Sequence, residues 1–228
     1  MEHYSVSKDG QRVVFVAAGE TGRLGVWLAS LNGSEPPRQL TTSDGLQAFF
    51  GAEHEVFFAA QEKGGTFIYR INEDGTGLLK VVPQPVYFLY DVSPDGKYVA
   101  TWSNGSTEET RNSVFLYPVD GGAPVLICGA CGYRGGGSVT TQVVSWSADQ
   151  KLVYLAFMGG SAVFSVPLRT GSVLPPLPQT GIRSFDDVAG LPGAKSFPVP
   201  GAIPGANPSV YVYPKLTAQR NIYRVPVP

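Results

Sequence analysis

The sequence is poor in the residues that most often carry chemistry. Of its 228 residues, two are cysteines and two are histidines, His3 and His54, which lie far from the cysteines along the chain. Structural zinc sites usually bring four such ligands together. The serine-hydrolase pattern Gly-x-Ser-x-Gly is also absent, because the nearest stretch, residues 159–163, lacks the final glycine. We therefore expect no metal site, no cofactor and no enzyme activity within this chain.

Charge and long apolar runs are scarce as well. Charged residues make up 15% of the chain and the net charge is -1, so no basic excess exists to neutralise a phosphate backbone, and we expect no nucleic-acid partner. No apolar run approaches the roughly 20 residues that cross a bilayer. The first ten residues lack the basic and apolar regions of a signal peptide. We expect no membrane insertion within this chain, and either a cytosolic location or a targeting segment upstream.

Turn-forming and hydrophobic residues are abundant instead. Hydrophobic residues make up 43% of the chain, and the 28 glycines and 19 prolines together are about a fifth of it. This composition is typical of a globular chain with many tight turns and few helices. It favours an all-β fold.

A four-residue turn motif recurs along the chain. Serine can bond a backbone N–H, proline presets φ, and glycine takes the left-handed position that closes a hairpin. A β-rich run follows each copy, so each copy predicts two strands joined by a tight turn. The copies are Ser93-Pro94-Asp95-Gly96, Ser7-Lys8-Asp9-Gly10, Ser147-Ala148-Asp149-Gln150 and a degenerate one at residues 51–54.

A second signal follows each copy, namely a strand with a central aromatic residue that runs toward an Asn-Gly, Asp-Gly or Thr-Gly turn. The aromatic positions lie 42, 46, 49 and 59 residues apart, at Trp27, Tyr69, Phe115, Phe164 and Tyr223. Four strands in a unit of 40 to 50 residues, roughly, is the size of a propeller blade. A single blade cannot bury both of its faces, whereas blades packed around an axis can.

We predict one all-β domain over residues 1–228, a β-propeller of four-stranded antiparallel blades. Four blades and a partial fifth are recognisable, so the ring is predicted to be incomplete. The approximate blades are 1–43, 44–86, 87–130, 138–178 and 179–228, with a poorly formed inner strand of the last blade near residues 196–199. The chain is then a fragment or the C-terminal part of a longer polypeptide; a five-bladed or open ring is the alternative.

These repeats resemble those of the TolB and dipeptidyl-peptidase propellers, which are WD40-like. The shared hallmark is Ser-Pro-Asp-Gly followed by lysine and a β run, best matched at residues 92–100 and 4–16. A TolB-type ring has six blades, more than the units found here. The resemblance implies a protein-binding surface and favours an extracytoplasmic or periplasmic location.

The ending Asn221-Ile222-Tyr223-Arg224-Val225-Pro226 also resembles the last strand of propellers that follow bacterial serine/threonine kinase domains. That second resemblance implies a sensor tethered to a signalling enzyme.

Strand order predicts which face could bind a partner. The tight turns all join first to second or third to fourth strands, so they share one face. The longer connections, residues 17–25, 103–112, 128–141 and 174–207, should lie on the other. Binding residues concentrate on irregular loops of a rigid scaffold. The candidate binding residues on that face are Glu108, Glu109, Arg111, Tyr133 and Arg134; a solvated loop tip is the alternative for the three charged residues near 110.

Cys128 and Cys131 form a C-x-x-C pair. A redox motif would need a thioredoxin-like βαβ setting, which the pattern lacks. A local disulfide or two reduced thiols remain, and the disulfide fits better if the chain is extracytoplasmic.

Taken together, the sequence predicts a non-catalytic propeller module for protein interaction or ligand sensing, part of a larger bacterial protein. Its partner would be a protein or a small ligand bound at the loop face. The alternative is the accessory propeller of a serine peptidase of the prolyl oligopeptidase or dipeptidyl-peptidase type, whose catalytic domain lies outside this chain.

Overall fold

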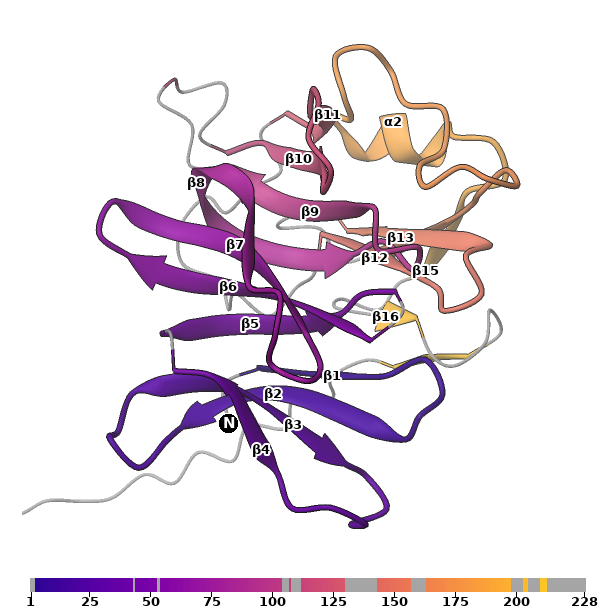
Figure 1. Ribbon diagram of the computed structural model, residues 1–228. Coiled ribbons are helices and arrows are strands. Elements are labelled where there is room, and N and C mark those ends of the chain that lie inside the picture. The colour runs from indigo at the N-terminus through magenta and orange to yellow at the C-terminus, as the bar shows by residue number, and fades with distance from the viewer. Residues whose placement is uncertain are drawn as a thin grey trace, which may run out of the picture.

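The computed structural model describes residues 3–42, 44–52, 54–103, 107, 112–129, 143–156, 163–197, 203–204 and 210–212. In this part of the chain nearly all regular structure is β-strand, arranged as antiparallel sheets whose strands follow one another in chain order. Figure 1 shows these sheets succeeding one another from β1–β4 at the bottom of the view to β12–β15 at the right.

The first sheet is β1 (His3–Val6), β2 (Arg12–Ala18), β3 (Leu24–Ser30) and β4 (Arg38–Thr41). The second sheet is formed by β5 (Gly45–Phe50), β6 (Glu55–Glu62), β7 (Gly65–Asn72) and the first part of β8 (Leu79–Val92). The third comprises the rest of β8 with β9 (Tyr98–Ser103), β10 (Val114–Pro118) and β11 (Val125–Cys128). The fourth is β12 (Val144–Trp146), β13 (Leu152–Ala156), β14 (Val163–Pro167) and β15 (Lys195–Phe197), and the pair β16 (Ile203–Pro204) and β17 (Tyr211–Val212) follows.

Strand β8 serves two sheets in succession. Its first part pairs with β7, and its second part pairs with β9 from Val86 onward, with register shifts along both ladders. One long strand is therefore the outer strand of the second sheet and the inner strand of the third. This explains why the two sheets are continuous as seven strands.

The serine turns have the predicted geometry. The Ser93 hydroxyl accepts the N–H of Tyr98 at 3.0 Å and donates to Asp95 Oδ1 at 2.6 Å, while Asp95 accepts the N–H of Lys97 at 3.1 Å. Gly96 takes a φ of 70°, in the left-handed region. The Ser7 and Ser147 turns repeat these bonds, which identifies the motif aspartate as a turn residue.

The two sets of tight turns share one face, as predicted. In each blade, a backbone hydrogen bond joins the end of the third strand to the start of the second strand, next to the first tight turn. The N–H groups of Leu31, Glu73, Val119 and Leu168 donate to the carbonyls of Gln11, His54, Lys97 and Lys151, respectively. We call this the turn face and the opposite one the loop face. Cys128 pairs with Val114, and Val114 also pairs with Trp102 near the end of β9. Since connection 103–112 begins at that end of β9, the end of β11 lies toward the loop face.

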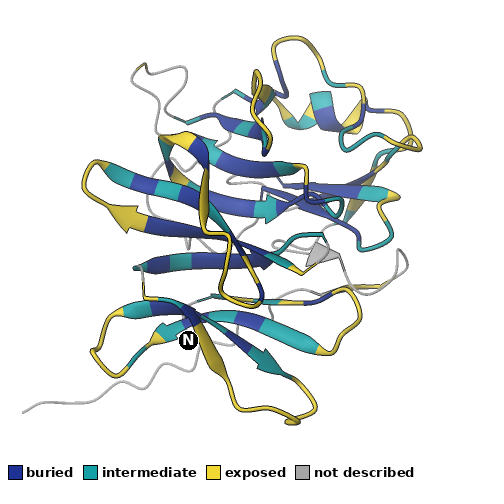
Figure 2. Cartoon of the chain, viewed as in Figure 1, coloured by how far each residue is buried: buried dark blue, intermediate teal, exposed yellow. Residues whose placement is uncertain are grey.

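In the described residues, most of the core lies in three apolar layers, one between each pair of neighbouring sheets, and a smaller apolar cluster lies on the other side of the fourth sheet. Alternate residues along a strand point to opposite faces, so each central sheet contributes to two layers. Figure 2 shows this burial running along the strands of the second and third sheets. Representative fully buried members are Val14 with Phe58, Phe57 with Leu89, and Leu116 with Val153.

The fourth sheet departs from the predicted pattern. Strand β15 pairs with β14 through Phe197 and Val163, so it is the outer strand of the fourth sheet. The prediction of an inner strand of a fifth blade near residues 196–199 is wrong, and the fourth sheet extends beyond the approximate bound at 178. The sequence predicts a tight turn at Thr170-Gly171 between the third and fourth strands of this blade. Instead, residues 168–194 form a long connection between β14 and β15, which we call the excursion.

The excursion fills the space between the third and fourth sheets. Ile182 donates its N–H to the Ile127 carbonyl at 2.8 Å, which places the segment beside β11. A short helix, α2 (Phe185–Ala189), follows, with a capping box formed by Ser184 and Asp187. Val188 is buried and the Phe185 ring meets Phe164 edge-on at 4.9 Å. Residues 174–194 thus belong to a third-to-fourth strand connection, so their predicted assignment to the loop face is wrong.

The innermost strands pack side by side in sequence. Strand β1 lies beside β5, β5 beside β8, β8 beside β12, and β12 beside β16. The sheets therefore succeed one another around a common centre. No helix in the described segments is long and apolar enough to cross a membrane.

Candidate functional site

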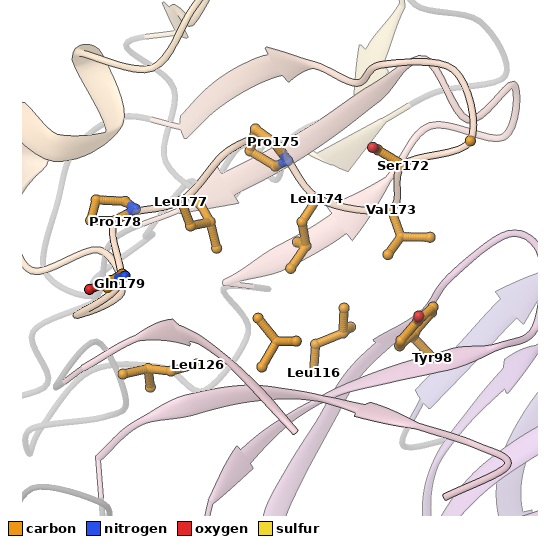
Figure 3. A pocket seen from close by; sticks show the side chains of 12 residues that line it. Tyr98, Leu116, Leu126, Ser172, Val173, Leu174, Pro175, Leu177, Pro178 and Gln179 are labelled. Atoms are coloured by element: carbon orange, nitrogen blue, oxygen red, sulfur yellow. The ribbon is translucent and has the colours of Figure 1, made fainter. Parts of the chain in front are cut away.

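A groove of about 510 Å³ lies between the third sheet and the excursion. One wall is formed by side chains from β9, β10 and β11, and the other by residues 171–179. Figure 3 shows side chains of both walls directed toward the space between them. The lining comprises Tyr98, Leu116, Val125, Leu126, Gly171, Ser172, Val173, Leu174, Pro175, Leu177, Pro178 and Gln179.

The sheet wall is set by strand alternation. Val114, Leu116 and Pro118 share one face of β10, and Leu116 pairs with Ala100 on β9 and Val125 on β11. Leu116 is almost fully buried, whereas Val125 at the strand edge is 44% exposed. The sheet therefore supplies a buried apolar floor and an open apolar rim.

The excursion wall is stiffened locally. The Trp146 indole N–H donates to the Val173 carbonyl at 2.7 Å, which ties the segment to the fourth sheet. Pro175, Pro176 and Pro178 fix φ at three nearby positions and lower the number of conformations open to the chain. Pro175 is itself buried. Both walls are thus held in place by contacts outside the groove.

Among the residues that the structure describes, the lining has no charged side chain. Tyr98, Ser172 and Gln179 carry its polar side-chain groups, and the remaining side chains are apolar or glycine. The volume falls within the range of about 300–1,000 Å³ that is common for small-molecule pockets. Such a groove suits an uncharged, largely apolar group.

A second hollow, of about 370 Å³, lies at the loop-face end of the first sheet. It is lined by Gly19, Glu20, Thr21, Arg23, Trp27, Gln39 and Thr42. Arg23 already pairs with Asp44 through contacts of 3.1 and 2.8 Å, and this hydrogen bonding holds the pKa of Asp44 below its ordinary value. The hollow belongs to connection 17–25, whose residues are all described.

A row of polar side chains joins the innermost strands. His3 accepts the N–H of Ala48 at 3.3 Å, and Gln47 accepts that of Leu89 at 3.3 Å. Asp91 accepts that of Trp146 at 3.1 Å. Each bond runs from one innermost strand to the next. The row therefore ties each sheet to its successor.

Burial shifts the titration of two members of this row in opposite directions. It lowers the pKa of His3 to about 4, against a weaker effect of the Ala48 hydrogen bond. It raises the pKa of Asp91 to about 7, although the N–H groups of Val92 and Trp146 favour the ionised form. At neutral pH the imidazole is uncharged and the carboxyl group is near its midpoint.

Most of the predicted site residues lie outside the described residues. These are Glu108, Glu109, Arg111, Tyr133, Arg134 and Cys131. Cys128 is buried and is not a free thiol, but its predicted partner Cys131 is not described, so the pairing stays a prediction. Among the described residues, no group of three or more histidine, cysteine or acidic side chains is placed to hold a metal ion.

Comparison with known proteins rests on structure alone. No family model and no curated protein matches the sequence. TolB from Acinetobacter baumannii is 18% identical with a TM-score of 0.53, and the match covers 75% of this chain and 41% of that one. The fold is a TolB-like β-propeller. The four-stranded sheets are its blades, and the described residues form no closed ring.

Two further solved structures share this fold. The tricorn protease is 14% identical with a TM-score of 0.51, covering 75% of this chain and 16% of that one. A chain of a nidogen/laminin complex is 11% identical with a TM-score of 0.50, covering 72% and 58%. This propeller thus spans less than two thirds of each matched chain. The resemblance to kinase-linked propellers finds no support in these matches.

Sequence reasoning missed the groove because the excursion resembled a route between blades. One local signal was available. Ser184-Phe185-Asp186-Asp187 has the serine-x-x-acid spacing of a capping box, which marks a helix start. A helix inside the proline-rich stretch would have indicated an inserted element in the fourth blade.

Proposed function

We propose that this propeller is a non-catalytic binding module that takes an uncharged apolar group into the groove beside its third blade. The group would be a small apolar ligand or an apolar side chain of a partner protein. The observation that carries the proposal is the lining, which has apolar side chains on both walls and, among the described residues, no charged side chain. Propeller scaffolds keep such loops and insertions in a fixed geometry, which lowers the entropic cost of binding.

The same lining supports a binding role over catalysis. General acid–base and nucleophilic catalysis need a histidine, carboxylate, thiol or amine within reach of the substrate. The groove offers one tyrosine, one serine and one glutamine. No base among the described lining residues accompanies Ser172, so none of them could activate this serine.

A fluorescence titration with N-phenyl-1-naphthylamine tests the proposal, because this neutral dye brightens when it enters an apolar site. We expect saturable binding at one site per chain. Leu177→Arg should weaken it at least tenfold, since a charge would enter an apolar groove. Leu78→Arg is the control, because Leu78 is 52% exposed and does not line the groove. Equal binding by the two variants, or no saturable binding, would contradict the proposal.

An accessory role beside a peptidase is the second candidate. It is favoured by the likeness to the tricorn protease, of which this chain matches only 16%. The polypeptide encoded around these residues separates the candidates. A hydrolase domain with a Gly-x-Ser-x-Gly elbow would support the accessory role, and kinase motifs would support a sensor role.

A further inference from the structure

A chain of hydrogen bonds joins a carboxyl group at the centre of the fold to one wall of the groove. Asp91 Oδ2 accepts the backbone N–H of Trp146 at 3.1 Å, and the Trp146 indole N–H donates to the Val173 carbonyl at 2.7 Å. Val173 lines the groove, and Figure 3 shows its side chain directed toward the sheet wall. Asp91 and Trp146 are not themselves lining residues, so any effect of Asp91 on a ligand there is indirect.

The excursion wall depends on this indole bond. In the described residues it is the single hydrogen bond that joins residues 171–179 to a blade. The backbone bonds near this segment are local, since Ser172 donates to the Arg169 carbonyl and Gly181 to that of Pro178. The sheet wall, by contrast, belongs to the continuous ladder of β9, β10 and β11. A displacement of Trp146 would therefore move the excursion wall against a fixed sheet wall.

Asp91 has no counter-ion in the described part of the chain. Near Asp91, strand β8 packs against β5, β9 and β12. Strands β5 and β12 carry no titratable side chain, and β9 carries only Tyr98. Strands β6 and β7 pack against the earlier part of β8, and their charged residues, Glu55, Glu62 and Arg70, do not contribute to the pKa of Asp91. The carboxyl group is therefore held by backbone N–H groups and not by an ion pair.

Protonation changes the bond from Asp91 to Trp146. Burial raises the pKa of Asp91 to about 7, so both forms are present near neutral pH. The ionised carboxylate makes charge-assisted hydrogen bonds, which are about twice as strong as neutral ones. The protonated group instead carries an O–H donor, whereas its described partners, Val92 and Trp146, offer it N–H groups. The ionised form therefore holds Trp146 more tightly.

We propose that Asp91 is a pH-sensitive switch for the groove, in which the ionised carboxylate holds Trp146 and thereby keeps the Val173 wall in its binding geometry. This inference rests on the binding role proposed for the groove. Because coupling between two sites is reciprocal, a bound ligand favours the ionised form in turn. The ligand does not cover Asp91, so it adds little desolvation that would favour the protonated form. Binding should therefore tighten as pH rises through neutrality.

The titration with N-phenyl-1-naphthylamine, repeated at about pH 6 and about pH 8, tests the proposal, because these values lie on either side of the Asp91 midpoint. The dye stays neutral over this range. We expect the wild-type chain to bind it at least about fivefold more tightly at the higher pH. Asp91→Asn cannot ionise and should bind equally at both pH values, with the weaker affinity. His3→Gln is the matched control, since His3 belongs to the same polar row but bonds to Ala48, and it should keep the wild-type pH dependence.

Trp146→Phe tests whether the coupling passes through the indole group. This variant keeps Asp91 but removes the donor to Val173, so the pH dependence of dye binding should disappear. A second measurement needs no change in the core. The NMR resonance of the Trp146 indole N–H in the unaltered chain should shift with a midpoint near pH 7, and this shift should be absent in Asp91→Asn.

Three outcomes separate this proposal from the proposed function. Equal dye affinity of the wild type at both pH values would overturn the switch and leave the binding role intact. Wild-type pH dependence in Asp91→Asn would overturn it as well. Absence of saturable dye binding at both pH values would contradict the binding role, and the Trp146 resonance would then decide the switch, which fails if that resonance does not titrate.

Discussion

The first-to-second and third-to-fourth blade contacts are alike near the centre and different farther out. In both, a polar side chain of one innermost strand, His3 or Asp91, accepts an N–H from the next. Farther out, the first-to-second contact has a polar cluster at the turn face. In this cluster Arg12 pairs with Glu73, and His54 Nδ1 lies 3.4 Å from Glu73 Oε2. The third-to-fourth contact instead contains the excursion.

The difference follows from the length of one connection. In the first blade residues 31–37 join the third strand to the fourth, which leaves the turn face free for Arg38 to donate to the Glu73 carbonyl. In the fourth blade residues 168–194 make the same connection and insert Ile182, Val188 and Leu191 between the sheets. The same blade architecture therefore allows two kinds of contact between neighbouring blades. One is the polar cluster of Arg12, Arg38 and Glu73, which we call the polar clasp, and the other is the apolar insertion of the excursion.

The contributions of Asp91 and His3 to the free energy of unfolding should change with pH in opposite directions, because burial shifts their pKa values in opposite directions. Asp91→Asn tests the larger of the two effects. Because the folded pKa of about 7 exceeds the ordinary 3.8, the folded state binds the proton more tightly. The Asp91 contribution to the free energy of unfolding therefore falls as pH rises from about 4 to 7, by up to about 4 kcal/mol. The asparagine variant keeps an acceptor for Trp146 and should lose this fall. Urea unfolding at several pH values measures it; an unchanged pH profile would count against the assignment.

His3→Gln tests the opposite slope. The folded pKa of about 4 lies below the ordinary 6.5, so the folded state disfavours the protonated ring. The His3 contribution to stability therefore grows as pH rises from about 4 to 6.5, by up to about 3 kcal/mol. Glutamine already serves this role at Gln47, so the variant should fold and lose the rise. The wild type should show a flatter profile than either variant, and a steeper wild-type profile would contradict the comparison.

Glu73→Gln tests the polar clasp and should have the smallest effect of the three. Glu73 is nearly buried and pairs with Arg12, so loss of its charge should lower the free energy of unfolding by about 1–2 kcal/mol. Asp44→Asn is the matched control, because the Arg23–Asp44 pair is exposed and should contribute little. Urea unfolding compares the two variants. Equal losses would show that the clasp is no stronger than a surface pair.

Much of the fold could be predicted from local sequence. The Ser93 turn and its copies, the aromatic strands around Trp27 and Phe115, and the shared face of the tight turns depend on residues close together in the chain. Strand alternation then fixes which side chains enter each apolar layer. These features were predicted because backbone geometry and periodicity determine them.

The candidate site could not be predicted in the same way. Leu116 and Leu177 face one groove only because the excursion lies beside β11, held by Ile182 and Val173. The proline-rich composition of that segment fits a blade connection as well as an inserted wall. The predicted loop residues, such as Glu108 and Arg134, remain predictions.

By itself the sequence determined the repeating unit, since serine turns, Asx-Gly turns and alternating strands are set by φ preferences and a two-residue period. The tertiary structure alone decided what lies between and beside the blades. It placed β15 in the fourth blade and opened the groove beside the third. Those outcomes depend on long-range packing, in which the same apolar residues are covered or exposed according to what the chain brings next to them.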